Sequence, residues 1–241
     1  MSCIYLIRHG QASALSEDYD QLSPKGEQQA IALGEHLATS GFNASRLLAG
    51  TMKRHQQTAS LTVNQLFAYR NKAKGQVQPP AITSIAELNE LDHQNIIGQY
   101  DQRFHSAKAM IEHARGLANP KNFFLETFGL AISKWTQTTD NQGYSESWHQ
   151  FYQRIKLAEQ SLVELAQGQK NTLVFSSGGP ISMLTCFALG LDPKQFLMVN
   201  QTLVNAGMTK FIIDSNGRLK LSSLNQHDFL ERLPGKLVTY T

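Results

Sequence analysis

A short apolar run near the start of the chain ends abruptly in three residues of a different kind. Cys3-Ile4-Tyr5-Leu6-Ile7 leads directly into Arg8-His9-Gly10. A run this short, rich in Ile and Tyr and ended by Gly, predicts a buried strand with its polar residues at the carboxyl end. Ligands bind at that end of the strands in open α/β sheets. The segment therefore predicts a sheet with a ligand site at the end of its first strand.

The three polar residues suit phosphate chemistry. Arg8 supplies a permanent cation whose fork geometry matches phosphate. His9 supplies a nitrogen that is nucleophilic near neutral pH, and Gly10 lets the backbone turn closely around a bound anion. The alternative is a strand whose Arg8 and His9 are solvated by the following loop. The tripeptide alone leaves both interpretations open, because short motifs also match by chance.

Length and composition exclude several classes of protein. A chain of 241 residues suits one α/β domain, and its hydrophobic fraction of 41% and charged fraction of 17% are typical of a globular protein. The 22 Lys and Arg are scattered and leave a net charge of only +3. This balance fits a small anionic substrate and gives no argument for nucleic acid.

Cysteine usage and hydropathy give a compartment. Cys3 and Cys186 both lie in apolar surroundings, so we expect buried thiols and neither a disulfide nor a metal pair. Arg8 and His9 interrupt the apolar stretch near the N-terminus, so no signal peptide is expected. No apolar run approaches membrane-spanning length. We therefore expect a cytoplasmic protein with no membrane partner.

Strand-like and helix-like segments alternate over most of the chain. Ser23 is suited to cap a helix that starts at Pro24 and carries Glu27 in its first turn. The unbroken apolar run over 171–176 predicts a central strand covered on both faces. The pattern predicts further strands over 46–50 and 81–86, helices over 52–70, 146–166 and 178–189, and a terminal hairpin of 208–213 with 219–224. The fold class expected is three-layer α/β/α with a mostly parallel central sheet.

The alternation stops between residues 92 and 145. This region is helix-rich and aromatic. We predict a single domain over 1–241 in which 92–145 form a helical lid, inserted over the active edge of the sheet. The alternative is an ordinary helical flank of the domain.

Polar residues follow the other predicted strands as well. Arg54 comes after the second strand, where a strand-to-helix turn aims basic side chains at the same edge as Arg8. Two arginines there would hold one phosphoryl group from both sides. Glu90 follows the third strand and suits an acid that protonates a leaving oxygen. The alternatives are a helix-surface arginine and a loop carboxylate, with Glu87 as a competing acid.

The central strand ends in Ser176-Ser177-Gly178-Gly179-Pro180, before a predicted helix. Small side chains and N–H groups at such a turn make an anion cradle, for which Ser177 and Gly178 are the candidates. The spacing does not match the Gly-x-Ser-x-Gly of a serine nucleophile elbow.

Together these segments resemble the histidine phosphatase superfamily, also called phosphoglycerate mutase-like. The resemblance rests on segments spread in the family's order over about three quarters of the chain: Leu6 to Gly10, Lys53-Arg54 with Gln57-Thr58-Ala59, Leu88-Asn89-Glu90, Glu146-Ser147 with Arg154, and Val174 to Ile181.

The resemblance implies a reaction. His9 would attack phosphorus and become a phosphohistidine, which water then hydrolyses. Arg8 and Arg54 would bind the phosphoryl oxygens, and Glu90 would protonate the leaving group. No metal or other cofactor is implied, because the arginines provide the positive charge. His9 must present a neutral nitrogen, so we expect its other ring nitrogen to donate to a backbone carbonyl.

One position departs from the family's pattern. The family places a second histidine at the end of the central strand, where this chain has Ser177. A hydroxyl donates one hydrogen bond but carries no positive charge. Losing the charge-assisted contact of a histidine raises the free energy of the transition state by about 3 kcal/mol, which is roughly a hundredfold in rate. We predict that His93, three residues after Glu90, supplies the missing donor; the alternative is a solvated loop histidine.

The remaining histidines are expected at the surface or in packing, since none has metal-ligand spacing: His36, His55, His105, His113, His149 and His227.

Smaller departures concern the pocket. Ala12, with Ser13 next to it, stands where the family has a small hydroxyl residue, and Gly98 is the nearest candidate for a glycine that the family has closer to the acid. Gly143 is likewise separated from Glu146-Ser147. These differences predict a longer loop after Glu90 and a differently shaped pocket.

Three functions follow from these observations. The first is a metal-independent phosphatase acting on a small phosphomonoester or a phosphorylated side chain. The second is phosphoglycerate mutase activity, and the third is a catalytically weak protein that binds a phosphorylated ligand. The natural substrate and the oligomeric state do not follow from the sequence.

Overall fold

The computed structural model describes residues 2–13, 20–75 and 77–240. The chain forms two compact units, which are described one after the other. The first unit comprises Met1–Glu90 and Ile155–Thr241, and the second comprises Leu91–Arg154.

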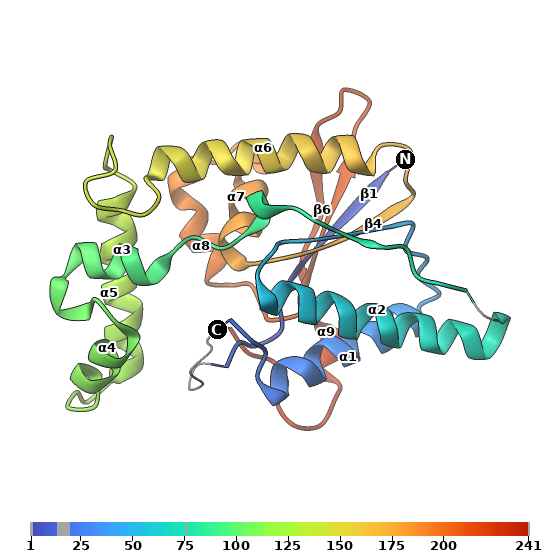
Figure 1. Cartoon of the computed structure of the whole chain (residues 1–241), viewed down its shortest axis with the longest axis horizontal. Coiled ribbons are helices and arrows are strands. Elements are labelled where there is room, and N and C mark those ends of the chain that lie inside the picture. The colour runs from blue at the N-terminus through green and yellow to red at the C-terminus, as the bar shows by residue number, and fades with distance from the viewer. Residues whose placement is uncertain (1, 14–19, 76, 241) are drawn as a thin grey trace. The chain divides into compact units, whose positions relative to one another are not determined.

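The first unit is built on a mixed sheet, which confirms the predicted fold class (Figure 1). Its strand order is β3-β2-β4-β1-β5-β6. The first four strands along the chain run parallel, and β5 and β6 are antiparallel to their neighbours. The strands are β1 (Cys3–Arg8), β2 (Arg46–Ala49), β3 (Ile82–Ser84), β4 (Asn171–Ser176), β5 (Met208–Ile213) and β6 (Leu219–Gln226).

Helices cover both faces of this sheet. The α1 and α2 side carries the core cluster, in which Ile7, Leu173 and Phe175 from the strands pack with Leu33 and Leu66 from the helices. On the other side lie α7 and the part of α6 that belongs to this unit (Figure 1). The helices are α1 (Pro24–Thr39), α2 (Lys53–Lys74), α6 (Trp148–Ala166), α7 (Gly178–Leu189), α8 (Phe196–Asn200) and α9 (Asp228–Glu231).

Local signals set the helix bounds. Ser23 Oγ accepts from the Gly26 N–H at 3.1 Å, which confirms the predicted N-cap of α1. α2 runs to Lys74, four residues beyond the expected end, because Gly75 (φ +84°) supplies the stop. α6 begins at Trp148 and not at residue 146, because Ser147 Oγ accepts from the Gln150 N–H at 3.2 Å. The third strand is shorter than predicted, since the chain turns into a 3₁₀ helix (η1, Ala86–Leu88) soon after it.

The second unit is helical and aromatic, as predicted for this region. Trp135, Trp148 and Phe151 form its aromatic core, with ring centroids 5.4–6.1 Å apart. Arg154 pairs with Glu146 through two hydrogen bonds of 2.7 Å. The unit holds α3 (His93–Tyr100), η2 (Gln102–Phe104), α4 (Ala107–Ala114), α5 (Pro120–Trp135) and the first turns of α6. The role of residues 92–145 as a lid stays a prediction.

Both cysteines are free thiols. Cys186 is buried, which raises its pKa to about 11 together with the charge of Asp192. Cys3 is only partly buried, contrary to expectation, although it begins β1. Across the described residues, none of the helices combines the length and the apolar character needed to cross a membrane.

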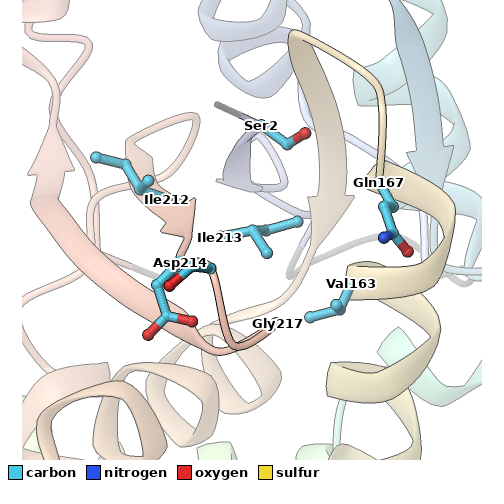
Figure 2. Close-up of a pocket in the computed structure, with 8 residues that line it drawn as sticks. Ser2, Val163, Gln167, Ile212, Ile213, Asp214 and Gly217 are labelled. Carbon is cyan, nitrogen blue, oxygen red and sulfur yellow. The ribbon is translucent and has the colours of Figure 1, made fainter.

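A pocket in the first unit lies at the amino end of β1 (Figure 2). Its wall includes Ser2, which precedes β1, and the turn that follows β5. The lining residues are Ser2, Val163, Gln167, Ile212, Ile213, Asp214, Ser215 and Gly217. Since β1 runs from this pocket toward His9, the pocket lies at the opposite end of the strand from the predicted site.

Candidate active site

The parallel register brings the predicted residues to one edge of the sheet. Arg8 pairs with Ser176 across β1 and β4, and Ala49 pairs with Phe175 across β2 and β4. The His9 N–H donates to the Ser176 carbonyl at 2.8 Å. The residues that follow β1, β2 and β4 are therefore neighbours, as the sequence predicts.

His9 is held as a neutral imidazole with one bare nitrogen. The ring is 5% exposed, and its Nδ1 lies 2.7 Å from the Gly10 carbonyl oxygen. A carbonyl only accepts, so Nδ1 carries the hydrogen and Nε2 keeps its lone pair. This confirms the expected hydrogen bond. Burial holds the pKa of His9 well below its ordinary value of 6.5, and Arg54, His55 and Arg8 lower it further.

Arg8 is anchored by the chain's own backbone. Its Nη1 donates to the carbonyl of Leu203 at 2.5 Å and to that of Tyr240 at 3.3 Å. The guanidinium also passes close to α7, because a Cβ at Gly178 would lie 3.5 Å from Arg8 Nε. The buried cation is thus fixed at the strand edge beside His9.

Arg54 stands in the first turn of α2 and is 3% exposed. Its Nη1 pairs with Asp20 Oδ1 at 2.8 Å, while Asp20 Oδ2 accepts from the Lys53 N–H at 2.8 Å. Thr58 Oγ1 donates to the Arg54 carbonyl and accepts from the Gly10 N–H, which ties α2 to the end of β1. The arginine is therefore buried and oriented, not a helix-surface residue. No local sequence pattern predicts this role for Asp20.

Glu90 reaches the same edge from the loop after β3. Ser176 Oγ donates to the Leu88 carbonyl at 2.7 Å, and the Asn89 side chain exchanges two hydrogen bonds with Thr51. The carboxylate of Glu90 then accepts from the Gly179 N–H at 3.1 and 3.3 Å. A negative charge is favourable at this N-terminus of α7.

In the predicted glycine cradle, backbone N–H groups do not all point to an open anion site. The Gly179 N–H already serves Glu90, and Gly178 makes room for a neighbour, since a Cβ there would lie 2.2 Å from Asn200 Oδ1. Gly10 likewise packs closely, with Gly26 O only 2.4 Å from where its Cβ would lie. Phosphate binding by Gly10 and Gly178 stays a prediction.

Ser177 has a partner that the sequence pattern does not predict. Its Oγ lies 2.6 Å from Nε2 of His55, and both residues are fully buried. The His55 ring centroid is 5.7 Å from that of His9. The lack of metal-ligand spacing predicts only a surface or packing role for His55. Its position directly after Arg54, at a helix start on the active edge, was the available signal.

His93 begins α3 in the second unit, where the Asp92 side chain caps the helix by accepting from the Asn95 N–H. Its proposed contact with a phosphoryl group stays a prediction. Within the described residues, no three His, Cys, Asp or Glu side chains are grouped so that they could hold a metal ion.

A family model of the histidine phosphatase superfamily (branch 1) matches residues 4–99 and 124–226, which is most of the chain. The chain belongs to the histidine phosphatase superfamily. The match includes β1 with its Arg8-His9-Gly10 end, Arg54, Glu90 and the turn after β4. A comparison with curated proteins found no match.

Solved structures of phosphatases and of a phosphoglycerate mutase share the fold. The α-ribazole phosphatase of Shigella flexneri is 20% identical with a TM-score of 0.62, over 93% of this chain and 96% of that one. Phosphoglycerate mutase of Bacillus anthracis is 19% identical with a TM-score of 0.60, over 95% and 94% of the two chains. A mycobacterial glucosyl-3-phosphoglycerate phosphatase is 15% identical with a TM-score of 0.60, over 94% and 100%.

Family and fold together support an enzyme of the phosphatase type. The edge holds a neutral imidazole with a bare nitrogen, two buried guanidinium groups and a carboxylate. Such a set can attack phosphorus, hold a phosphoryl group and exchange a proton with an oxygen.

Proposed function

We propose that this protein is a metal-independent phosphatase that hydrolyses a small phosphomonoester or a phosphorylated side chain through a phosphohistidine on His9. The observation that carries the proposal is the fixed tautomer of His9. Its Nδ1–H is bound to the Gly10 carbonyl, so Nε2 is a bare nucleophile held next to Arg8 and Arg54. A lowered pKa keeps this nitrogen unprotonated at neutral pH.

In the first half of the reaction, His9 Nε2 attacks phosphorus. The P–N bond forms as the bond to the leaving oxygen breaks, and that oxygen takes a proton from Glu90, which enters this step as the protonated carboxylic acid. Arg8 and Arg54 stabilise the charge on the equatorial oxygens. The alcohol then leaves, and Glu90 remains as a carboxylate.

In the second half, a water molecule replaces the leaving group. Glu90 takes a proton from this water while the water oxygen attacks phosphorus, and the P–N bond breaks. Inorganic phosphate leaves, His9 regains its lone pair and Glu90 regains its proton. One carboxyl group thus serves as acid and then as base, and no metal is required by this scheme.

The test is turnover of p-nitrophenyl phosphate by the whole protein and by the His9→Ala variant, with a chelator present. We expect turnover that disappears in the variant, and a radiolabelled phosphoryl group that is retained on the wild type after rapid denaturation in alkali. Equal turnover by both proteins would contradict the proposal. Turnover that the chelator abolishes would contradict its metal independence.

Two alternatives are tested with two further ligands, 3-phosphoglycerate and inorganic phosphate. Transfer between positions of 3-phosphoglycerate without net phosphate release would favour a mutase. Tight binding of inorganic phosphate without turnover would favour a weak enzyme that acts as a phospho-ligand sensor. Ser177 motivates this last alternative, because the resemblance leads us to expect a second histidine there.

A separate variant tests His93. If His93 supplies the missing donor, His93→Ala should lower turnover of p-nitrophenyl phosphate by about a hundredfold. Unchanged turnover would exclude His93 from the site.

A further inference from the structure

Ser177 occupies a helix cap position without serving as a cap. It is the N-cap residue of α7, yet its side chain makes no capping hydrogen bond. A serine there usually accepts from an N–H of the first turn. In this protein the Gly179 N–H donates to the Glu90 carboxylate instead. The Ser177 hydroxyl is therefore available to His55, 2.6 Å away.

The chain makes room for His55 at this place. A Cβ on Gly50 would lie 2.2 Å from His55 Nδ1 and 2.9 Å from Cε1, so only glycine at position 50 allows the ring to pack there. Gly50 follows β2 and its N–H donates to the Phe175 carbonyl, which fixes it beside the end of β4. The His55 imidazole consequently packs between the ends of β2 and β4 and is fully buried.

The contacts of the ring select one tautomer. Nε2 faces Ser177 Oγ, whereas Nδ1 has no hydrogen-bond partner among the described residues. A buried N–H without an acceptor is less tolerated than a buried lone pair without a donor. The hydrogen therefore sits on Nε2, which donates to Ser177 Oγ. Burial, together with the charge of Arg54, lowers the pKa of His55 to about 3, so the ring is neutral at physiological pH.

We infer that His55 and Ser177 form a relay in which His55 holds the Ser177 hydroxyl and that hydroxyl donates to a phosphoryl oxygen during transfer to His9. The inference rests on the proposed function. Ser177 follows the residue whose carbonyl binds the His9 N–H, so its hydroxyl belongs to the same edge. A hydroxyl that accepts an N–H becomes a stronger donor itself. Ser177 is then a catalytic residue and His55 a positioning residue, and neither forms or loses a covalent bond.

The relay predicts that the two side chains act as one unit. We would measure kcat and KM for p-nitrophenyl phosphate in Ser177→Ala, His55→Leu and the double variant. Removing the donor should lower kcat about a hundredfold. His55→Leu should lower it by about ten- to a hundredfold, and the double variant should be no slower than Ser177→Ala. Losses that multiply in the double variant, or an unchanged kcat in Ser177→Ala, would overturn the relay.

Two further variants separate positioning from simple packing. His55→Gln keeps an N–H donor near the place of Nε2 and should retain more of kcat than His55→Leu. Ser182→Ala is the matched control, since Ser182 is, like Ser177, a fully buried serine, but it lies inside α7 and its hydroxyl donates to the Gly178 carbonyl. We expect turnover close to wild type in this control. Equal losses in His55→Gln and His55→Leu would show that His55 only fills space.

The tautomer itself is measurable without turnover. Nitrogen-15 spectra of the folded protein should show His55 with hydrogen on Nε2 at pH 7, and Ser177→Ala should change that signal. A hydrogen on Nδ1 would overturn the assigned direction of the bond.

Failure of the relay and failure of the proposed function give different results. If the wild type neither turns over p-nitrophenyl phosphate nor depends on His9, the proposed function fails. The same cycle of variants is then measured by calorimetry with inorganic phosphate. The relay predicts weaker binding in Ser177→Ala and His55→Leu, with no further loss in the double variant. Unchanged phosphate binding in all three would overturn the relay as well.

Discussion

At the scale of single residues, Glu90 carries two functions with one carboxyl group. It accepts from the Gly179 N–H at the start of α7 and, in the proposed reaction, exchanges a proton with the leaving oxygen and with water. The hydrogen bond keeps the carboxylate oriented. The two functions can be separated, because an amide can still accept a hydrogen bond but cannot donate the proton that the leaving oxygen needs.

Glu90→Gln should therefore lose activity while it keeps its fold. We expect kcat/KM, which reports the steps up to phosphoryl transfer to His9, to fall by about 10²- to 10⁴-fold for an alkyl phosphate, and less for p-nitrophenyl phosphate, whose leaving oxygen needs little help from an acid. Glu87→Gln, three residues earlier, is the control and should stay near wild type. A uniform loss of kcat/KM for both substrates would show that Glu90 does not act as the acid.

Arg54 shows why charge alone is insufficient at this edge. Its guanidinium pairs with Asp20 and is buried, so its direction is fixed before a phosphoryl group arrives. Arg54→Lys keeps the positive charge but loses the fork. We expect kcat/KM for p-nitrophenyl phosphate to fall about a hundredfold. Arg70→Lys changes a partly exposed arginine of the same helix and should have no effect; a loss of equal size there would contradict the assignment.

At the scale of elements, two glycines let the end of β1 meet the start of α1. Gly10 and Gly26 approach so closely that a Cβ on either would lie within 2.4 Å of a backbone oxygen of the other segment. The contact holds the His9 turn against a capped helix. The reason for Gly10 seen in the structure is thus helix packing, in addition to any role that it has toward an anion.

Gly26→Ala should be destabilising, because the new Cβ would lie 2.2 Å from the Gln11 carbonyl oxygen. Relieving that clash would require one of the two backbone segments to move. We expect a loss of about 2–3 kcal/mol in the free energy of unfolding, measured by urea titration. Gly129→Ala, inside α5 with nothing within 4 Å of the new Cβ, is the control and should gain about 0.5–1 kcal/mol. A neutral Gly26→Ala would show that the contact is looser than described.

The elements and most of the edge could be predicted because their signals are local. The Ser23 cap, the apolar run of β4 and the polar ends of the strands lie within a few residues of the features that they determine. The His55–Ser177 pair could not be found in this way. Its two members are 122 positions apart, and their contact depends on the register of β2 and β4 and on the space left by Gly50.

Asp20 was missed for a similar reason. It is an acidic residue in a polar loop, and only the folded chain places it against Arg54 and the start of α2. Sequence patterns report which side chains share a face or an edge. They do not report which side chain fills the space beside a catalytic group.

At the scale of the whole molecule, the buried histidines of the candidate site make the free energy of unfolding depend on pH. His9 and His55 are both buried, and both have a pKa below 6.5 in the folded state. The unfolded chain binds a proton on each near pH 6.5, whereas the folded protein does not until the pH is far lower, about 3 for His55. The unfolded state therefore binds more protons in this window, and stability must fall as the pH falls through it.

The free energy of unfolding should consequently decrease between pH 7 and pH 5. His55 contributes a loss of about 2 kcal/mol over this range, from a limiting slope of about 1.4 kcal/mol per pH unit, and the lowered pKa of His9 adds a loss in the same direction. His55→Gln removes one of the two groups, so its stability should fall by about 2 kcal/mol less than that of the wild type. Urea titrations of both proteins at pH 7, 6 and 5 measure the difference. Parallel curves of unfolding free energy against pH would mean that His55 takes up a proton in the folded protein as readily as in the unfolded chain. The His55 ring would then be charged in the folded protein. A charged ring so close to Arg54 is incompatible with the buried, neutral donor on which the relay depends.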